Sequence, residues 1–327
     1  MAIEVGRMGT QAVAGERITG DATGRFPEWL FRSMTRVAAF AIVALVILIA
    51  IQLVLGSRLA WQEFGLSFLT GTDWNPVKDI YGALPFIVGT LLTSLIALVI
   101  GAPIGLLTAI FLAELAPPRV AAPLIFLIEL LAAIPSVVVG LWGVFVLAPT
   151  LKVTVETWIV STLGWIPFFS GPTFGVGVFT AGVILSIMIL PTIVSIAREV
   201  IRAVPDGQRE AMLALGATRW EMTTRAVLPY ARSGIIGAVI LGLGRALGET
   251  MAVTMVVGNS TDIPDRLFDQ GQTIASQIAT TFNEAAVGLQ TSALIYLGLV
   301  LLAITISLNI VARLLVWRVT RPIGSET

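Results

Sequence analysis

The segment VAAFAIVALVILIAIQLVLG at residues 37–56 runs for twenty residues without a charged side chain. A helix of this length reaches across the hydrocarbon core of a bilayer, which is about 30 Å thick. Arg32 and Arg36 precede it, as basic residues precede a signal peptide, but no small-residue cleavage pattern follows. We therefore interpret the segment as a retained transmembrane span.

Composition extends this interpretation to the whole chain. Of its 327 residues, 56% are hydrophobic and 12% are charged, which is typical of a polytopic membrane protein. Six spans predict an all-α transmembrane bundle whose two termini lie on the same side. The five later spans are predicted at about 85–112, 124–148, 174–196, 234–257 and 291–312.

The basic residues predict the orientation. If the N-terminus is cytoplasmic, the arginine-rich stretch 198–232 is also inside, as the positive-inside rule requires. The external segments then hold only Arg58, Lys78, Lys152 and Arg266. The predicted organisation is a cytoplasmic tail at 1–36, a first helix at 37–56, an external loop at 57–84, a five-span core domain at 85–316 and a cytoplasmic tail at 317–327.

Several function classes are excluded by missing residue types. The chain has no cysteine and no histidine, so it cannot form disulfides, thiolate nucleophiles, catalytic triads or His-ligated metal sites. Its only lysines are Lys78 and Lys152, and neither follows the glycine that a phosphate-cradling P-loop requires. We expect no catalytic residue, no metal, no cofactor and no nucleic-acid partner for this chain.

The stretch VPDGQREAMLALGATRWEMTTRAVLPY at 204–230 is the most organised polar segment. Asp206 is predicted to cap a helix that runs to Leu215, where Gly216 supplies a left-handed stop. A second helix is predicted to open with a capping box. This leaves two readings, a solvated connector between spans or a rigid surface for a partner.

The second helix depends on three residues. Thr218 is its predicted N-cap and Glu221, three residues later, completes the capping box. Pro229 is expected to interrupt it, because proline lacks the backbone donor that an interior position needs. Two short helices joined at a glycine would then stand on the cytoplasmic side.

The same stretch resembles the coupling motif of ABC importer permeases, which reads Glu-Ala-Ala, three residues, Gly, nine residues and Ile-x-Leu-Pro. Met212 replaces the third alanine and Ala226 the isoleucine, and both stay apolar or small. The resemblance implies a type I ABC importer permease architecture, whose cytoplasmic coupling helices dock on partner ATPase subunits. Five positions match at the expected spacings: Glu210, Ala211, Gly216, Leu228 and Pro229.

Two further strings narrow the resemblance. GLGRALGETMAV at 242–253 is similar to the permeases of phosphate-specific importers, and FLTGTDWNP at 68–76 is similar to their C-type rather than A-type subunit. The likeness extends over roughly residues 60–318. It implies a bacterial inner membrane, an A-type permease as heterodimer partner, two ATPase subunits that use ATP and Mg, and an external phosphate-binding protein.

Two other functions stay open on the sequence alone. One is an ABC permease for molybdate, sulfate or phosphonate, in which the coupling loop would work in the same way. The other is an ATP-independent secondary transporter, in which Glu249 or Glu129 would carry protons. Inverted repeats would support that reading, but none is visible, and the coupling loop would then have no purpose.

Arg245 and Glu249 are the first candidates for the substrate pathway, because charges inside an apolar run are usually functional. The planar fork of a guanidinium matches a tetrahedral oxyanion in a bidentate manner. Glu249, one helical turn further, is expected on the same face, where it would hold the fork and offset the cost of burying it. Alternatively, the pair only locks two helices together.

Glu129 and Ser136 are the remaining candidates for the pathway. Glu129 would face the pore, pair with a basic group or lie at the interface. Ser136 follows Pro135 within the third predicted span, where its hydroxyl would either assist a ligand or satisfy the kinked backbone. Three glycines around Arg245 are expected to serve helix packing instead: Gly242, Gly244 and Gly248.

Overall fold

The computed structural model describes residues 25–320, and the chain divides into two units, Met1–Gln52 and Leu53–Thr327. The first unit contains most of α1 (Arg25–Gly56), in which Arg32 pairs with Glu28 at 2.6 Å. The helix begins twelve residues before the predicted start at 37. Residues 1–24 of the predicted N-terminal tail and 321–327 of the C-terminal tail lie outside the described residues.

The described chain has six helices long and apolar enough to cross a membrane, which confirms the predicted number. The second, fourth and sixth lie within about six residues of the predicted spans, the first starts earlier than predicted, and the third and fifth differ in ways described below. The six are Glu28–Gly56, Leu84–Leu115, Ser136–Leu163, Val178–Arg202, Arg219–Gly248 and Leu289–Leu314.

The predicted external loop is ordered and contains the only sheet within residues 25–320. It consists of α2 (Arg58–Phe64), the 3₁₀ turn η2 (Gly65–Leu69), β1 (Trp74–Asn75) and β2 (Ile80–Tyr81). The two strands pair antiparallel, with Trp74 opposite Tyr81. Their rings lie 4.9 Å apart, centroid to centroid, and burial with a hydrogen bond to Asp79 raises the pKa of Tyr81 to about 12.

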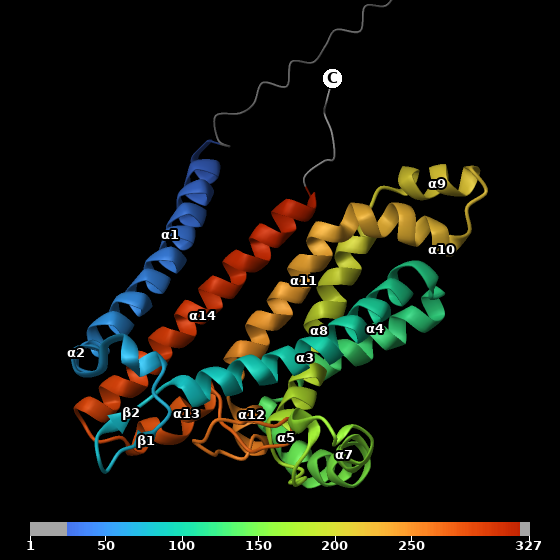
Figure 1. The fold of residues 1–327 in the computed structure, drawn as a ribbon. Coiled ribbons are helices and arrows are strands. Elements are labelled where there is room, and N and C mark those ends of the chain that lie inside the picture. The colour runs from blue at the N-terminus through green and yellow to red at the C-terminus, as the bar shows by residue number, and fades with distance from the viewer. Residues whose placement is uncertain (1–24, 321–327) are drawn as a thin grey trace, which may run out of the picture. The chain divides into compact units, whose positions relative to one another are not determined.

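The core of the second unit is the packing of α3 (Leu84–Ile110) against α8 (Val178–Arg202) (Figure 1). Glycines on α3 let the two backbones approach. A Cβ on Gly101 would lie 3.0 Å from the side chain of Ile189, and one on Gly105 would lie 2.9 Å from Ile193. Apolar side chains fill the seam, so α8 is the most buried of the six candidate spans.

The single third span predicted at 124–148 is wrong. After the π turn η3 (Phe111–Leu115), α4 (Pro118–Ala133) ends where Ile134 and Pro135 adopt extended backbone, with ψ of 127° and 136°. The proline ring removes a backbone donor, which favours a break at this point. The long helical segment starts after it and comprises α5 (Ser136–Trp142), π turn η4 (Gly143–Leu147), α6 (Ala148–Leu151), π turn η5 (Lys152–Glu156) and α7 (Thr157–Leu163).

The fifth span starts earlier and ends earlier than predicted. From Arg219 to Gly248 the chain is continuously helical, so Pro229 does not interrupt it. A π turn precedes the proline, which occupies the first turn of α11, where a missing backbone donor is tolerated. The elements here are α9 (Asp206–Ala214), α10 (Arg219–Met222), π turn η7 (Thr223–Val227), α11 (Leu228–Gly248) and α12 (Met251–Val256).

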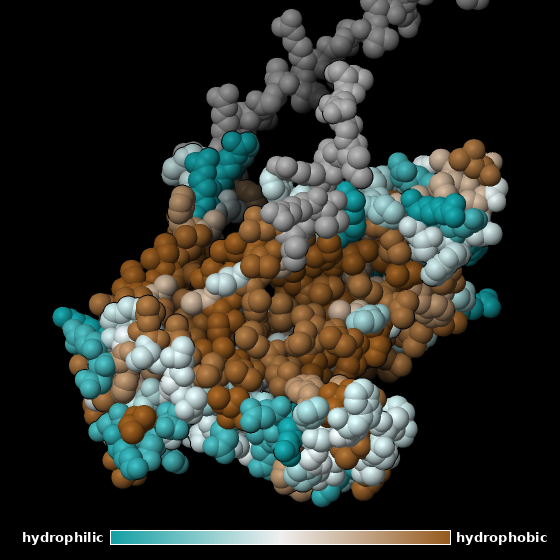
Figure 2. Space-filling view, viewed as in Figure 1, coloured by the Kyte–Doolittle hydropathy of each residue, from teal (hydrophilic) through white to brown (hydrophobic). Residues whose placement is uncertain are grey.

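The chain closes with a short and a long helix. α13 (Ile274–Thr281) and the 3₁₀ turn η8 (Phe282–Glu284) lead into α14 (Leu289–Thr320). Earlier in the chain, a further 3₁₀ turn, η6 (Pro167–Phe169), precedes α8. Ile274 N–H donates to Thr90 Oγ1 at 2.9 Å, which ties α13 to α3. Hydrophobic residues cover the flank formed by α3, α14 and α11. Hydrophilic residues gather at the end that carries α9 and at the end that carries β1 and β2 (Figure 2).

Candidate functional site

The predicted coupling stretch folds as one short helix, α9, joined through Gly216, which has φ of +83°, to the long helix that begins at Arg219, so the predicted short second helix is wrong. We call residues 206–222 the coupling hairpin. The capping box is confirmed: Glu221 N–H donates to Thr218 Oγ1 at 3.3 Å, and Thr218 N–H donates to Glu221 Oε2 at 3.0 Å. The predicted Asp206 cap is wrong. Pro205 occupies the N-cap position, so Asp206 is the first helical residue and its carboxylate accepts from Arg209 Nη1 at 3.1 Å.

The outer face of α9 and the turn that follows it are open to a partner. Glu210 and Ala211 are exposed, and the side chains of Leu215 and Trp220 are 84% and 69% exposed. Isolated exposed apolar residues are ordinary, but here two large ones lie within the matched coupling motif, on either side of Gly216. Of the other motif residues, Pro229 is exposed and Leu228 packs against the core beneath the hairpin.

A partly buried arginine attaches this hairpin to the bundle, and the sequence analysis did not predict it. Arg209 Nη2 donates to Glu114 Oε1 at 2.8 Å and to the Ile201 carbonyl at 2.9 Å, and its Nε reaches both Glu114 oxygens at 3.3 Å. Its Nη1 donates to the Val204 carbonyl as well as to Asp206. The hydrogen bond to Glu114 raises the pKa of Arg209 above its usual value.

Arg245 and Glu249 do not form the expected ion pair. Within residues 25–320 no salt bridge or side-chain hydrogen bond joins them, and α11 ends at Gly248. Glu249 has ψ of 130°, so the chain leaves the helical path there and the four-residue spacing no longer stacks the two side chains. Arg245 is exposed, whereas Glu249 is partly buried.

The glycines around Arg245 divide into two groups. A Cβ on Gly242 would lie 2.8 Å from Ile193, so this glycine packs α11 on α8 as expected. A Cβ on Gly244 or Gly248 would meet nothing within 4 Å, so these two pack no helix of the described chain, and their packing role stays a prediction. Arg245 therefore stands on a face of α11 that the rest of residues 25–320 leaves uncovered.

The other two pathway candidates lie on separate elements. Glu129 of α4 lines a small hollow with Ser195 and Arg198 of α8, so it lies near a basic group without an ion pair to it. Ser136 opens α5 and makes no capping hydrogen bond. In the described chain, no hydrogen bond or ion pair joins any two of the four predicted pathway residues, and each role stays a prediction.

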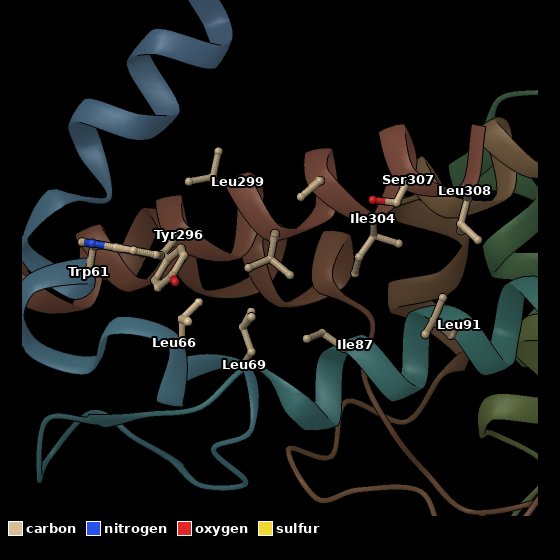
Figure 3. A pocket seen from close by; sticks show the side chains of 12 residues that line it. Trp61, Leu66, Leu69, Ile87, Leu91, Tyr296, Leu299, Ile304, Ser307 and Leu308 are labelled. Carbon is tan, nitrogen blue, oxygen red and sulfur yellow. The ribbon is translucent and has the colours of Figure 1, made fainter. Parts of the chain in front are cut away.

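One apolar groove of the described chain is not suited to an anion. It holds about 520 Å³ between η2, α3 and α14, and Figure 3 shows Trp61, Leu69, Ile87 and Ile304 around it. Tyr296 Oη, one of its few polar atoms, donates to the Gly65 carbonyl at 3.1 Å. Because no charged side chain lines the groove, a phosphate would lose its hydration there without compensation.

The described residues contain no group of three or more histidine, cysteine, aspartate or glutamate side chains that could hold a metal ion. The features that remain are an exposed coupling hairpin, the partly buried Arg209 beneath it and the exposed Arg245 in the fifth span.

Comparison with known proteins identifies the family. Residues 101–321 match the family described as "Binding-protein-dependent transport system inner membrane component". The chain belongs to this family. It is therefore a multi-pass permease of the ABC importer type, and the resemblance inferred from Glu210, Ala211, Gly216, Leu228 and Pro229 is confirmed at the level of the family.

Named relatives of this permease cover almost its whole length. It is 46% identical over 303 residues to "Phosphate transport system permease protein PstC" of Pasteurella multocida, covering 91% of this chain and 94% of that protein. It is 41% identical over 295 residues to "Phosphate transport system permease protein PstC 2" of Mycobacterium tuberculosis, covering 88% and 90%. These matches agree with the C-type resemblance of residues 68–76.

Solved structures share the fold of this permease at low sequence identity. A bacterial ABC transporter involved in the import of alginate aligns with a TM-score of 0.56 and 18% identity, over 89% of this chain and 99% of that chain. The MetNI methionine ABC transporter aligns with a TM-score of 0.50 and 18% identity, over 73% and 95%. The type I ABC importer permease architecture is thereby confirmed.

Proposed function

We propose that this permease is the C-type membrane subunit of an ATP-driven importer of inorganic phosphate. The observation that carries the proposal is the 46% identity to a phosphate transport permease over 91% of the chain. The GRALGETMAV string, which includes Arg245, also favours phosphate over molybdate, sulfate or phosphonate, because it resembles the permeases of phosphate-specific importers. The relatives described above give the proton-coupled alternative no support.

The proposed assembly has four kinds of partner in a bacterial inner membrane. An A-type permease pairs with this chain, two ATPase subunits bind below, and an external phosphate-binding protein delivers the substrate. Both termini are cytoplasmic in this arrangement, which places the arginine-rich α9 end inside. ATP and Mg are used by the ATPase subunits alone, since this chain has no phosphate-cradling loop.

Arg245 is the proposed phosphate contact. It lies in the last turn of α11, exposed, with Gly244 and Gly248 leaving the backbone beside it open. An unpaired guanidinium keeps its fork available for two oxygens of the anion, which a lysine ammonium could not match. We expect the A-type permease to face this surface, so that the anion passes between the two subunits.

The coupling hairpin is the proposed site of ATPase docking. Glu210, Ala211 and the exposed Leu215 would enter a cleft on an ATPase subunit, and nucleotide binding there would rock the permease pair between inward and outward openings. Nucleotide can shift the permease from one opening to the other only if the ATPase subunits bind the coupling hairpin more tightly in one of these two states.

The proposal is tested with the purified complex in nanodiscs. ATP hydrolysis is measured with the external protein loaded with phosphate, with the same protein unloaded, and with molybdate-binding and sulfate-binding proteins of the same organism. We expect only the phosphate-loaded protein to raise the rate. Equal stimulation by a molybdate- or sulfate-loaded protein would replace phosphate with that oxyanion.

A further inference from the structure

Arg209 and Glu114 form an ion pair between the coupling hairpin and the bundle, 95 residues apart in the chain. The Arg209 side chain is 17% exposed and that of Glu114 is 5% exposed. Burying two charges requires that their hydrogen bonds be satisfied, and here three donor nitrogens of the guanidinium reach the carboxylate, two backbone carbonyls and Asp206.

Three elements meet at this guanidinium. Arg209 itself belongs to α9, Glu114 lies in π turn η3 at the end of α3, and the Ile201 carbonyl belongs to the last turn of α8. Because the fork is planar and its donors diverge, it fixes the three elements in direction as well as distance. An apolar contact would allow them to slide.

The position of Arg209 in α9 connects this attachment to the docking face. The next two residues, Glu210 and Ala211, are exposed, whereas Arg209 points into the bundle. A force applied to the outer face of the nine-residue helix therefore acts on a side chain held by α3 and α8. These two helices form the core seam, and Ile193 of α8 packs against Gly242 of α11, three residues before Arg245.

We propose that Arg209, held by Glu114, is the positioning residue that transmits movement of the coupling hairpin to α3 and α8. The inference rests on the proposed function, because it needs ATPase subunits that move α9. Arg209 contacts neither phosphate nor nucleotide; it acts by fixing α9 to the two helices that its bonds reach.

A purely structural role predicts something different. Replacement of a buried ion pair by apolar residues of similar volume is often neutral or stabilising. Arg209→Met with Glu114→Leu should therefore keep the hairpin folded while removing the directional bonds. A structural pair would then be fully replaced, whereas a positioning pair would not.

The experiment measures ATP hydrolysed per phosphate taken up, in liposomes that contain the complete complex. The double variant Arg209→Met/Glu114→Leu should co-purify with its ATPase subunits and raise this ratio by at least about fivefold, the lower bound of ordinary coupling between sites. Arg209→Lys keeps the charge but loses the fork, so it should raise the ratio as well. Arg58→Lys, an exposed arginine outside the hairpin, should leave the ratio unchanged.

Each outcome decides between the claims. If the wild-type complex imports no phosphate, the proposed function fails. If the wild-type complex imports phosphate and both Arg209 variants keep its ratio, the proposed function stands and this inference is overturned. Should the double variant fail to assemble, Arg209→Lys alone decides, and loss of assembly in both would show that the pair only stabilises the fold.

Discussion

Arg245 and Glu249 are four residues apart, yet α11 ends between them and no ion pair joins them in the described chain. The arginine is exposed and the glutamate is partly buried. The guanidinium is therefore free to bind a ligand or a neighbouring subunit, whereas the carboxylate does not compete for its donors. The first two predictions depend on this separation.

Arg245→Lys should lower the rate of phosphate uptake at least about tenfold, equivalent to about 1.4 kcal/mol. The ammonium keeps the charge but cannot bind two oxygens of the anion at once. Uptake of labelled phosphate is measured beside co-purification of the ATPase subunits, with Arg58→Lys as control. Uptake at the wild-type rate would remove the substrate role of Arg245.

Glu249→Leu should not impair assembly of the complex. Since Glu249 does not neutralise Arg245 within this chain, its removal strands no paired charge. Assembly is measured by size-exclusion chromatography of the purified complex. The prediction is contradicted if Glu249→Leu disperses the subunits and the added change Arg245→Met restores them, because that result requires an ion pair.

Gly216→Val should uncouple ATP hydrolysis from uptake while the membrane spans stay assembled. Gly216 has φ of +83° and open space around it, so the penalty comes from the backbone, about 1–2 kcal/mol for an ordinary side chain. Gly216→Asn should retain coupling, because asparagine tolerates this conformation. Gly207→Ala on the same hairpin, at ordinary φ and with equal space, is the control. Equal coupling in Gly216→Val and Gly207→Ala would show that the turn is only a connector.

Gly89→Ala should lower the free energy of unfolding by about 1–3 kcal/mol, because it overpacks the end of the bundle at which α3 begins. The added Cβ would lie 2.2 Å from the Gln272 carbonyl oxygen, which is backbone and cannot rotate away. The melting temperature of the purified protein is compared with that of Gly237→Ala, where a Cβ meets nothing within 4 Å. A Gly89→Ala protein as stable as the Gly237→Ala control would contradict the close approach of α3 and the 258–273 segment.

Periodicity and local signals predicted much of this structure. The number of spans follows from apolar runs, which depend on composition alone. The capping box of Thr218 and Glu221 and the left-handed Gly216 were predictable because they involve residues within a few positions of each other. The capping box begins the second helix of the coupling hairpin, and Gly216 forms the turn before it.

The failures have physical causes beyond local pattern. Pro229 was expected to break a helix, but a preceding π turn absorbs its missing donor. The end of α11 was missed although Gly248 stands there, because that glycine was expected to serve helix packing and not to end the helix. The Arg209–Glu114 pair joins residues 95 positions apart. The sequence signal for this pair was Glu114, a carboxylate at the end of an apolar span. Such a residue needs a partner, but the sequence does not show which residue that is.

Uptake of labelled phosphate into liposomes containing the complete complex is the most direct test of the proposed function. The measurement compares uptake of phosphate, sulfate and molybdate, each supplied outside the liposome together with the external binding protein. It is made with ATP enclosed in the lumen, which the ATPase subunits face, and again without ATP. We predict uptake of phosphate that depends on ATP and is not displaced by the other two anions. ATP-dependent uptake of all three at equal rates, or phosphate uptake without ATP, would contradict it.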